Sequence, residues 1–301
     1  MIRQSQFDQL LKPMIVHTFD LGMNRVPSMR AELFSIMNSN RAYEEGTGIG
    51  GISPDVWDSY NQSGQKGVVD FNQLYTQTYT HVEYPVRIPV QIKLIQNDQY
   101  GVIQEKIRRV GMSAEQKMEL DAASLLNKAF TGALWSDGVA LCSDSHPLSP
   151  KSASGTQDNL GTEVLSKQAL SDTRVEMMHF TDDAGNEIGL MPNELWVPPE
   201  LEDTAIEITK SLNDPSSANN AVNPQNGRWI VKPWLRLTDT NAWFVVDGMW
   251  RQEVVKWYVR EQIADNLMLV HEDTTDLVYE AKLHYSFGVD DWRWIYGHNP
   301  S

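Results

Sequence analysis

The stretch that decides the fold is YTHVEYPVRIPVQIKLI, residues 79–95. From Val82 to Leu94 every even-numbered residue is apolar, and every odd-numbered residue between them is polar or proline. This period of two predicts a β strand that buries one face. At ~3.3 Å per residue, residues 81–95 would extend over roughly 50 Å, whereas a compact chain of this length has a radius of gyration of only ~19 Å. The strand is therefore expected to reach out of the body.

Two prolines limit how this strand can pair. Pro85 and Pro89 are an even number of residues apart, so both remove an N–H group from the same lateral edge. That edge cannot form a regular ladder, and the strand can pair fully along one edge only. We expect a projecting two-stranded hairpin whose other strand comes from residues 68–79. An edge strand of a compact sheet, bent at the prolines, fits the pattern equally well.

The chain on either side adds a flexible segment and several helices. Residues 44–67 hold six of the nineteen glycines, which predicts a loop or flexible arm. Apolar spacing predicts one long or slightly broken helix over residues 98–131, interrupted at Gly111. A further helix should begin at Ser166, with Leu165 and Leu170 as a hydrophobic staple. Another should follow Pro198-Pro199, with a stripe of Leu201, Ala205, Ile208 and Leu212.

The C-terminal part predicts strands. Residues 228–237 and 243–246 are two short candidates, and residues 277–287 alternate as a strand with one buried face. After Gly288 the apolar register shifts, which indicates a bulge or tight turn over residues 288–291. No internal repeat is found. The fold class is predicted to be α+β.

Composition excludes several classes of protein. The 301 residues are 41% hydrophobic, which indicates a folded globular chain, and their net charge is −15. A surface this acidic argues against a protein whose task is to grip nucleic acid. The single cysteine, Cys142, excludes an intrachain disulfide. With neither a signal-like apolar core nor a membrane-length apolar run, the sequence predicts a soluble protein of a reducing cytoplasm.

A search for catalytic chemistry finds no candidate site. The GTGIGG cluster lacks the preceding strand and the Gly-Lys-Ser/Thr of a phosphate loop. Cys142 and His146 are four residues apart, but His146 precedes a proline and neither residue has the setting of a nucleophilic pair. The histidines show no metal-ligand spacing, and the tryptophans fall mostly in apolar strand patterns, where core packing is expected. The sequence predicts no enzyme, no metal and no cofactor.

Several strings, taken in order, resemble the major capsid proteins of tailed bacteriophages, which have the Hong Kong 97-type shell fold, and most of all the Mu-like major head subunits. The strings cover roughly residues 93–250, about half the chain. They are IQND (95–98), DGVALCSDSHPL (137–148), GTQDNLGTEVLSKQALSDTRVEMM (155–178), LMPNELWVPPELEDTA (190–205) and AWFVVD (242–247).

The resemblance implies a division of the chain. Residues 1–43 would be an N-terminal arm and residues 44–95 an extended loop that lies over a neighbouring subunit. Residues 96–133 and 262–301 would form a peripheral domain with a long spine helix, and residues 134–261 an axial domain that meets its copies around the hexamer and pentamer axes. The apolar face of the extended loop would then be buried against another copy. Its expected assembly residues are Tyr84, Val86, Ile88 and Val90.

The implied function is a head protein that self-assembles into the icosahedral shell around a double-stranded DNA genome. Expected partners are other copies, a separate scaffolding protein, a portal, possible decoration or minor capsid proteins, and DNA held without sequence specificity; no membrane is involved. The expected location is the virion, after assembly in the host bacterial cytoplasm. Two alternatives stay open: an encapsulin-like nanocompartment shell, and a Trp-rich carbohydrate-binding or hydrolase domain. A container need not grip its DNA, so the acidic charge is compatible with the shell.

Overall fold

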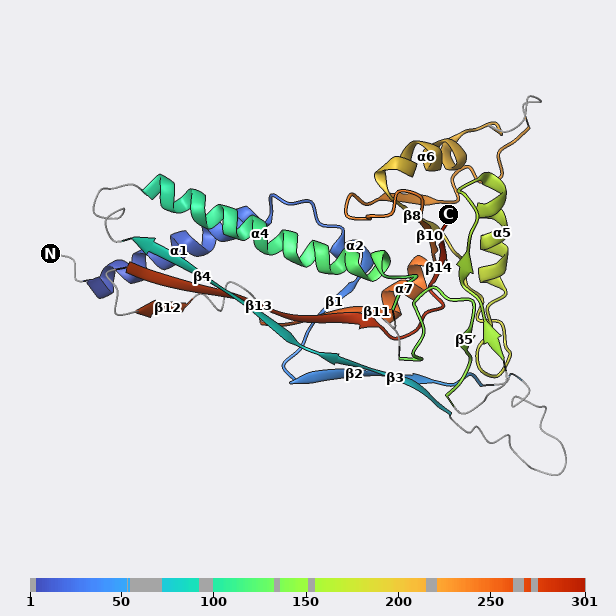
Figure 1. Ribbon diagram of the computed structural model, residues 1–301, viewed down its shortest axis with the longest axis horizontal. Helices are drawn as coiled ribbons and strands as arrows, with labels where there is room; N and C mark the ends of the chain where they lie inside the picture. Colours follow the sequence, from blue (N-terminus) through green and yellow to red (C-terminus); the bar gives the residue numbers. More distant parts are fainter. Residues whose placement is uncertain are drawn as a thin grey trace. The chain divides into compact units, whose positions relative to one another are not determined.

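The computed structural model describes residues 4–52, 54, 72–91, 100–132, 136–150, 155–214, 221–261, 268–271 and 276–300. The chain divides into two compact units, and each has its own sheet (Figure 1). The first unit comprises Met1–Glu44, Tyr79–Ala122 and Trp257–Phe287. The second unit comprises Glu45–Thr78, Ala123–Lys256 and Gly288–Ser301.

The first unit is built on a sheet whose strand order is β1-β11-β13-β12, with β4 also paired to β13. Its strands are β1 (Ser35–Asn38), β4 (Val82–Gln91), β11 (Val255–Glu261), β12 (Met268–His271) and β13 (Asp276–Val289). Its helices are α1 (Gln4–Met23), α2 (Arg30–Leu33) and α4 (Tyr100–Asn127). The elements β11, β13 and α4 run on into the second unit. The predicted strand at residues 277–287 is thus confirmed, and it is longer than predicted.

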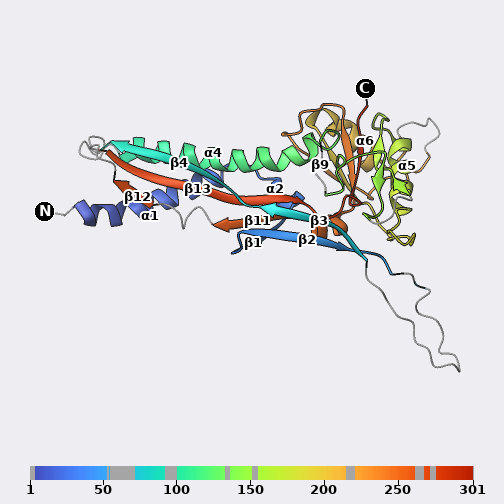
Figure 2. The same ribbon diagram turned by 60° about the horizontal axis from the view of Figure 1, so that its bottom comes forward.

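The expected hairpin is wrong. Strand β4 pairs antiparallel with β13 from Val82↔Tyr285 to Gln91↔Asp276. Strand β3 (Gln73–Thr80), the expected partner, pairs instead with β2 (Tyr43–Ile49), as Figure 2 shows. Only His81 separates β3 from β4, and a reversal of the chain needs a connection of at least about two residues. Among the described strands β4 pairs with β13 alone, so it is an edge strand as the alternative expected, and residues 92–95 lie outside the described part of the chain.

The long helix forms as predicted but without a break. Helix α4 continues through Gly111. The glycine is needed there because α1 and α4 touch at this point. A Cβ atom on Gly111 would collide with the carbonyl oxygen of Phe19, and one on Gly22 would collide with that of Arg108. The two helices therefore pack with their backbones in contact, which only glycine permits.

The second unit contains a five-stranded sheet of order β7-β14-β10-β8-β9. Every residue of β8, β10 and β14 is buried. The strands are β7 (Leu160–Gly161), β8 (Glu194–Val197), β9 (Ile230–Pro233), β10 (Trp243–Val246) and β14 (Ile295–His298), and a separate small ladder joins β5 (His146–Pro147) to β6 (Thr156–Gln157). The helical elements are α5 (Lys167–Met178), η2 (Pro199–Leu201), α6 (Glu202–Lys210) and α7 (Gly248–Val254).

Local signals place the helices of this unit well. The Ser166 hydroxyl accepts a hydrogen bond from the backbone N–H of Ala169 at 3.1 Å, which is the expected cap of α5. Helix α6 follows the two prolines as predicted, but Leu212 lies beyond its end and is exposed, so it is not part of the buried stripe. The predicted loop at residues 44–67 is also wrong in part, because Tyr43–Ile49 forms strand β2.

Candidate assembly surface

The predicted assembly residues lie on β4, and their side chains are buried to different degrees. Ile88 is 5% exposed, whereas Val86 is 43% exposed and Tyr84 is half-buried. The side chain of Val90 lies outside the described part of the structure. Alternation alone predicted one uniform apolar face, but packing covers Ile88 and leaves Val86 accessible.

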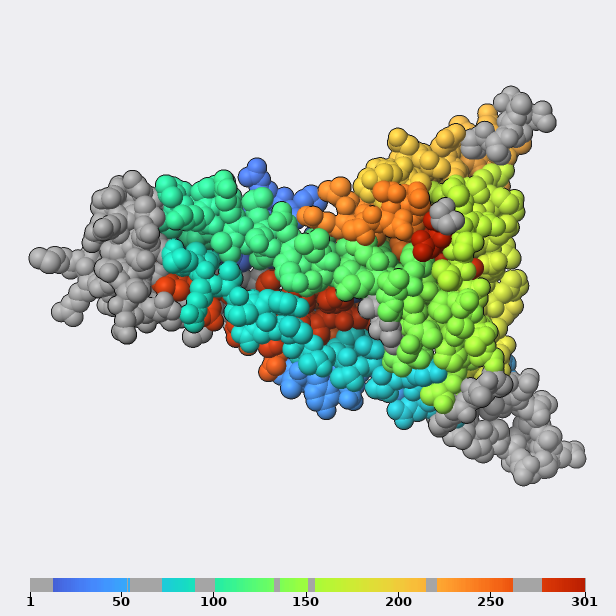
Figure 3. All heavy atoms as spheres, viewed as in Figure 1, coloured from blue at the N-terminus to red at the C-terminus, as the bar shows by residue number. Residues whose placement is uncertain are grey.

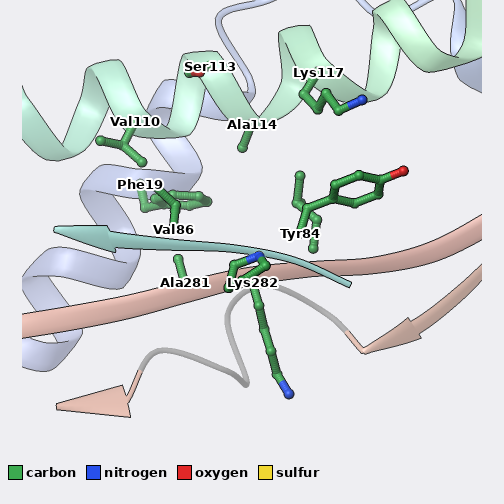
Figure 4. A pocket seen from close by; sticks show the side chains of 11 residues that line it. Phe19, Tyr84, Val86, Val110, Ser113, Ala114, Lys117, Ala281 and Lys282 are labelled. Atoms are coloured by element: carbon green, nitrogen blue, oxygen red, sulfur yellow. The ribbon is translucent and has the colours of Figure 1, made fainter. Parts of the chain in front are cut away.

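A groove of about 160 Å³ borders this face of β4. Phe19 of α1 and Val110, Ala114 and Lys117 of α4 line it together with residues of β4 and β13. Figure 4 shows Val86 and Tyr84 pointing from β4 toward α4, while the Lys282 side chain points away. The predicted contact face is thus partly occupied by helices of the same chain.

Charged and aromatic groups fix one end of the groove. The Lys117 ammonium lies 4.7 Å from the centre of the Tyr84 ring, which favours a cation–π contact. Lys117 also pairs with Asp121 at 2.5 Å, and the Tyr285 hydroxyl donates to the same carboxylate at 2.5 Å. Burial and this hydrogen bond raise the pKa of Tyr285 above its ordinary value. Tyr84 is consequently held in one place, which suits a preorganised contact surface.

The residue between β3 and β4 is pinned by side chains of the first unit. His81 contacts the Ser39 hydroxyl through Nε2 at 3.2 Å and the Ser286 hydroxyl through Nδ1 at 2.9 Å. Its ring also lies 6.0 Å from that of His284. Partial burial lowers the pKa of His81, and the nearby His284 lowers it further. These contacts hold the point at which the chain changes pairing partner from β2 to β13.

The glycines of residues 46–51 have a structural use that the sequence did not predict. A Cβ atom on Gly46 would collide with the carboxylate of Asp290, and one on Gly51 would collide with that of Asp182. The backbone N–H of Gly51 donates to Asp183 Oδ1 at 2.6 Å. Asp182, Asp183 and Asp290 therefore lie against the glycines at the base of the β2–β3 ribbon within the second unit.

The residues considered for catalysis are structural in the described chain. Cys142 is buried, and burial raises the pKa of its thiol. His146 contacts Asp137 Oδ2 at 2.7 Å and Asn159 Oδ1 at 3.1 Å and stacks on Trp292 at 4.2 Å. These contacts tie together a loop and occupy the polar atoms of the ring.

The described residues also offer little to the other chemistries. They contain no group of three His, Cys, Asp or Glu side chains that could hold a metal ion. No described helix combines the length and the apolar character that a membrane crossing requires. The tryptophans predicted to be core residues are buried, as expected; these are Trp196, Trp229, Trp234 and Trp243. Buried indole rings cannot stack on a sugar.

Sequence reasoning missed the partners of the predicted face. Lys117, Asp121 and Tyr285 fix Tyr84, but they come from segments far from it in the sequence. The one available signal was the matching alternation of residues 277–287, which marked a second strand with one apolar face and hence a possible partner for β4.

Comparisons with known proteins agree with this architecture. The solved structures that share the fold include the procapsid subunit of bacteriophage JBD30, with a TM-score of 0.59 and 16% identity over 78% of this chain and 100% of that chain. The capsid of an empty GTA particle gives a TM-score of 0.52 and 12% identity over 92% of this chain and 91% of that chain. The virus-like particle of Pyrococcus furiosus gives a TM-score of 0.51 and 11% identity over 95% of this chain and 98% of that chain.

These structural likenesses establish the Hong Kong 97-type α+β fold, and the family follows from the sequence. No curated protein matched the chain. A family model described as phage capsid protein matches residues 75–297, which is most of the 301 residues. The chain belongs to the phage capsid protein family.

Proposed function

We propose that this chain is the major head subunit of a tailed phage and that its copies assemble into an icosahedral shell around double-stranded DNA. The family match over residues 75–297 carries the proposal. The fold supports it, because capsid and procapsid subunits share it across most of their length. The subunit acts through its interfaces and not through catalysis. Individually weak contacts, repeated over many copies, make closure of a shell effectively irreversible.

The finer assignments are part of the proposal. We place the chain among the Mu-like head subunits and keep the division into an arm (1–43), an extended loop (44–95), a peripheral domain (96–133 and 262–301) and an axial domain (134–261). Within the loop, the β2–β3 ribbon is the part that projects to a neighbour. A two-stranded ribbon is only marginally stable by itself, which favours support from a second copy. Tyr84, Val86, Ile88 and Val90 are proposed as the apolar face used in assembly. Val86 is the most accessible of those described, and Ile88, 5% exposed, supports this face from within the subunit.

The partners follow from the same reading. The JBD30 capsid is decorated with minor capsid protein trimers, and we propose that similar proteins can bind this shell. A separate scaffolding protein and a portal complete the set, and the DNA is held without sequence specificity. The subunit is assembled in the host cytoplasm and ends in the virion.

One specific likeness favours a second candidate. The virus-like particle of Pyrococcus furiosus has the same fold over nearly all of both chains. A nanocompartment shell that encloses a protein is therefore the runner-up.

Expression of the full chain, followed by light scattering and negative-stain microscopy, tests the proposal. We expect capsomers or closed megadalton particles, and DNA within particles made during phage growth. A stable monomer at micromolar concentration, with or without scaffold, would contradict a shell function. Closed particles that contain a protein cargo and no DNA would favour the nanocompartment.

A further inference from the structure

The surface at which α6 ends is both apolar and basic. Three large apolar side chains are exposed on the segments that meet at this helix end: Leu212 is 81% exposed, Val222 82% and Ile230 54%. Backbone hydrogen bonds from Asn223 to Leu212 and from Gly227 to Thr209 join these segments. Lys210 and Arg228 are exposed on the same segments. We call these five residues the exit patch.

The exit patch is held rigidly although its side chains are exposed. The amide group of Asn223 donates to the carbonyl oxygens of Ile208 at 2.7 Å and Ser211 at 3.0 Å. The Asn226 amide donates to Lys210 and Ser211, both at 2.9 Å. These bonds satisfy carbonyl groups that a helix end leaves unpaired. They also attach the segment before β9 to the last turn of α6, so little freedom is lost when a partner binds.

The cations of the patch are available to a partner. Neither Lys210 nor Arg228 has an acidic partner among the described residues. Lys210 lies in the last turn of α6, where the helix dipole favours a positive charge. A complementary surface should therefore combine apolar and acidic side chains.

Helix α5 offers such a surface on the same unit. The exposed residues Gln168, Asp172, Val175 and Glu176 of α5, with its C-cap His179, follow the spacing i, i+4, i+7, i+8, i+11 and form one stripe. Val175 is 50% exposed, and Asp172 and Glu176 flank it with negative charge. We call Asp172, Val175 and Glu176 the α5 stripe. Figure 3 shows the yellow-green atoms of α5 at the surface of this unit.

We propose that the exit patch of one copy binds the α5 stripe of the next copy. Two different surfaces of identical subunits make a heterologous contact, and such a contact repeats around a closed ring. Arg228 and Lys210 would face Asp172 and Glu176, while Ile230 and its apolar neighbours would cover Val175. This inference rests on the proposed shell function, and it names the surfaces by which the second unit meets its copies.

Nucleic acid is the competing occupant of a basic surface. Binding to DNA relies mainly on many phosphate contacts, whereas the exit patch has two cations and three exposed large apolar side chains. Apolar groups gain more from a protein surface, which favours the second copy.

Charge exchange in the full-length chain tests the contact. Arg228→Glu and Asp172→Lys should each reduce the yield of capsomers or particles, by up to about fivefold per lost contact, with a larger total effect because each ring repeats the contact. The double variant should regain most of the yield. An equimolar mixture of the two single variants should also form hexamers, because the variants can alternate around a ring of six and each then meets a complementary surface on the other. Lys106→Glu and Glu253→Arg make the same charge changes at exposed residues elsewhere and should assemble normally.

Unfolding curves and light scattering separate the outcomes. Each variant should unfold close to the wild-type denaturant concentration, because both side chains are exposed and Asp172 loses only its exposed hydrogen bonds from Gln168. The inference is overturned if the wild type assembles while the double variant and the mixture stay as defective as the single variants, or if the single variants assemble normally. Particles formed in normal yield that retain less DNA would assign the exit patch to nucleic acid and also overturn it. A wild type that stays monomeric would remove the proposed function together with the inference.

Discussion

Two separate aspartate substitutions on β4 should have different effects: Ile88→Asp should impair folding of the subunit, and Val86→Asp should impair assembly. Ile88 is 5% exposed, so Ile88→Asp removes a buried side chain and places a carboxylate where water cannot reach it. Loss of a buried aliphatic side chain costs about 2–5 kcal/mol, and an unpaired buried charge adds to that. A total of roughly 4 kcal/mol or more is a large part of the ~5–15 kcal/mol that stabilises a typical domain.

Val86→Asp should behave differently because its side chain is 43% exposed. Full burial of a valine stabilises by roughly 1.5–3 kcal/mol, so the loss in the isolated subunit should be about 1 kcal/mol. If a neighbouring copy covers Val86, the carboxylate becomes buried on assembly and should block it. Val86→Thr and Ile88→Val are the controls of nearly the same size.

Urea unfolding of dissociated subunits, followed by tryptophan fluorescence, measures the first effect, and light scattering at fixed subunit concentration measures the second. The reasoning is refuted if Val86→Asp loses as much stability as Ile88→Asp, since both would then belong to the subunit core. It is equally refuted if folded Val86→Asp assembles at the wild-type yield, because Val86 would then lie outside every interface.

Three further changes test other contacts. Gly111→Ala should lower the free energy of unfolding, measured in urea, by about 1–3 kcal/mol, because the new methyl group meets the Phe19 carbonyl. Gly101→Ala is the control: it has open space around it and should be neutral or stabilising by up to about 1 kcal/mol. Equal effects of the two changes would argue against the close α1–α4 contact. Burial lowers the pKa of His298 from 6.5 to about 4, so the unfolded chain takes up a proton at a higher pH than the folded chain does. The contribution of His298 to the free energy of unfolding should be largest above pH 6.5 and fall by about 3 kcal/mol toward pH 4. In His298→Gln the free energy of unfolding should depend less steeply on pH between 6.5 and 4. Gly46→Ala should displace Asp290 and speed the exchange of backbone amide hydrogens in β2 and β3, while the amides of the rest of the second unit stay protected. Unchanged amide exchange in β2 and β3 would mean that Asp290 does not hold the base of the ribbon.

The residues that the sequence predicted well are those whose reasons are local. Ser166 caps α5 through a bond to an amide three residues away, and the alternation of residues 82–91 and 277–287 fixes which side chains share a face. The pairing of β4 was beyond such reasoning, because alternation describes the faces of a strand and not its edges. The prolines limited β4 to one partner, but they could not say that this partner lies nearly 200 residues further along the chain.

Burial within the candidate surface shows the same limit. Val86 and Ile88 have equal places in the pattern, yet one is accessible and the other is not. The difference depends on where α1 and α4 pass, and that depends in turn on backbone contacts at Gly22 and Gly111. A glycine in a helical pattern looks like a weak point of the helix. Only the opposing backbone explains why a larger side chain is not tolerated.

The net charge of −15 adds a constraint on how copies can meet. Identical acidic subunits repel one another, and the repulsion grows as more copies gather, although salt screens it beyond about 8–10 Å. A contact between copies must therefore offset this repulsion within short range. Exposed apolar side chains offset the repulsion because their burial is favourable and needs no charge. A pair of cations that faces two carboxylates adds attraction, but only in the one orientation that brings the two pairs together. The exit patch and the α5 stripe have these features. On this proposal the acidic excess disfavours other orientations, and Lys210 and Arg228 favour the one that closes a ring.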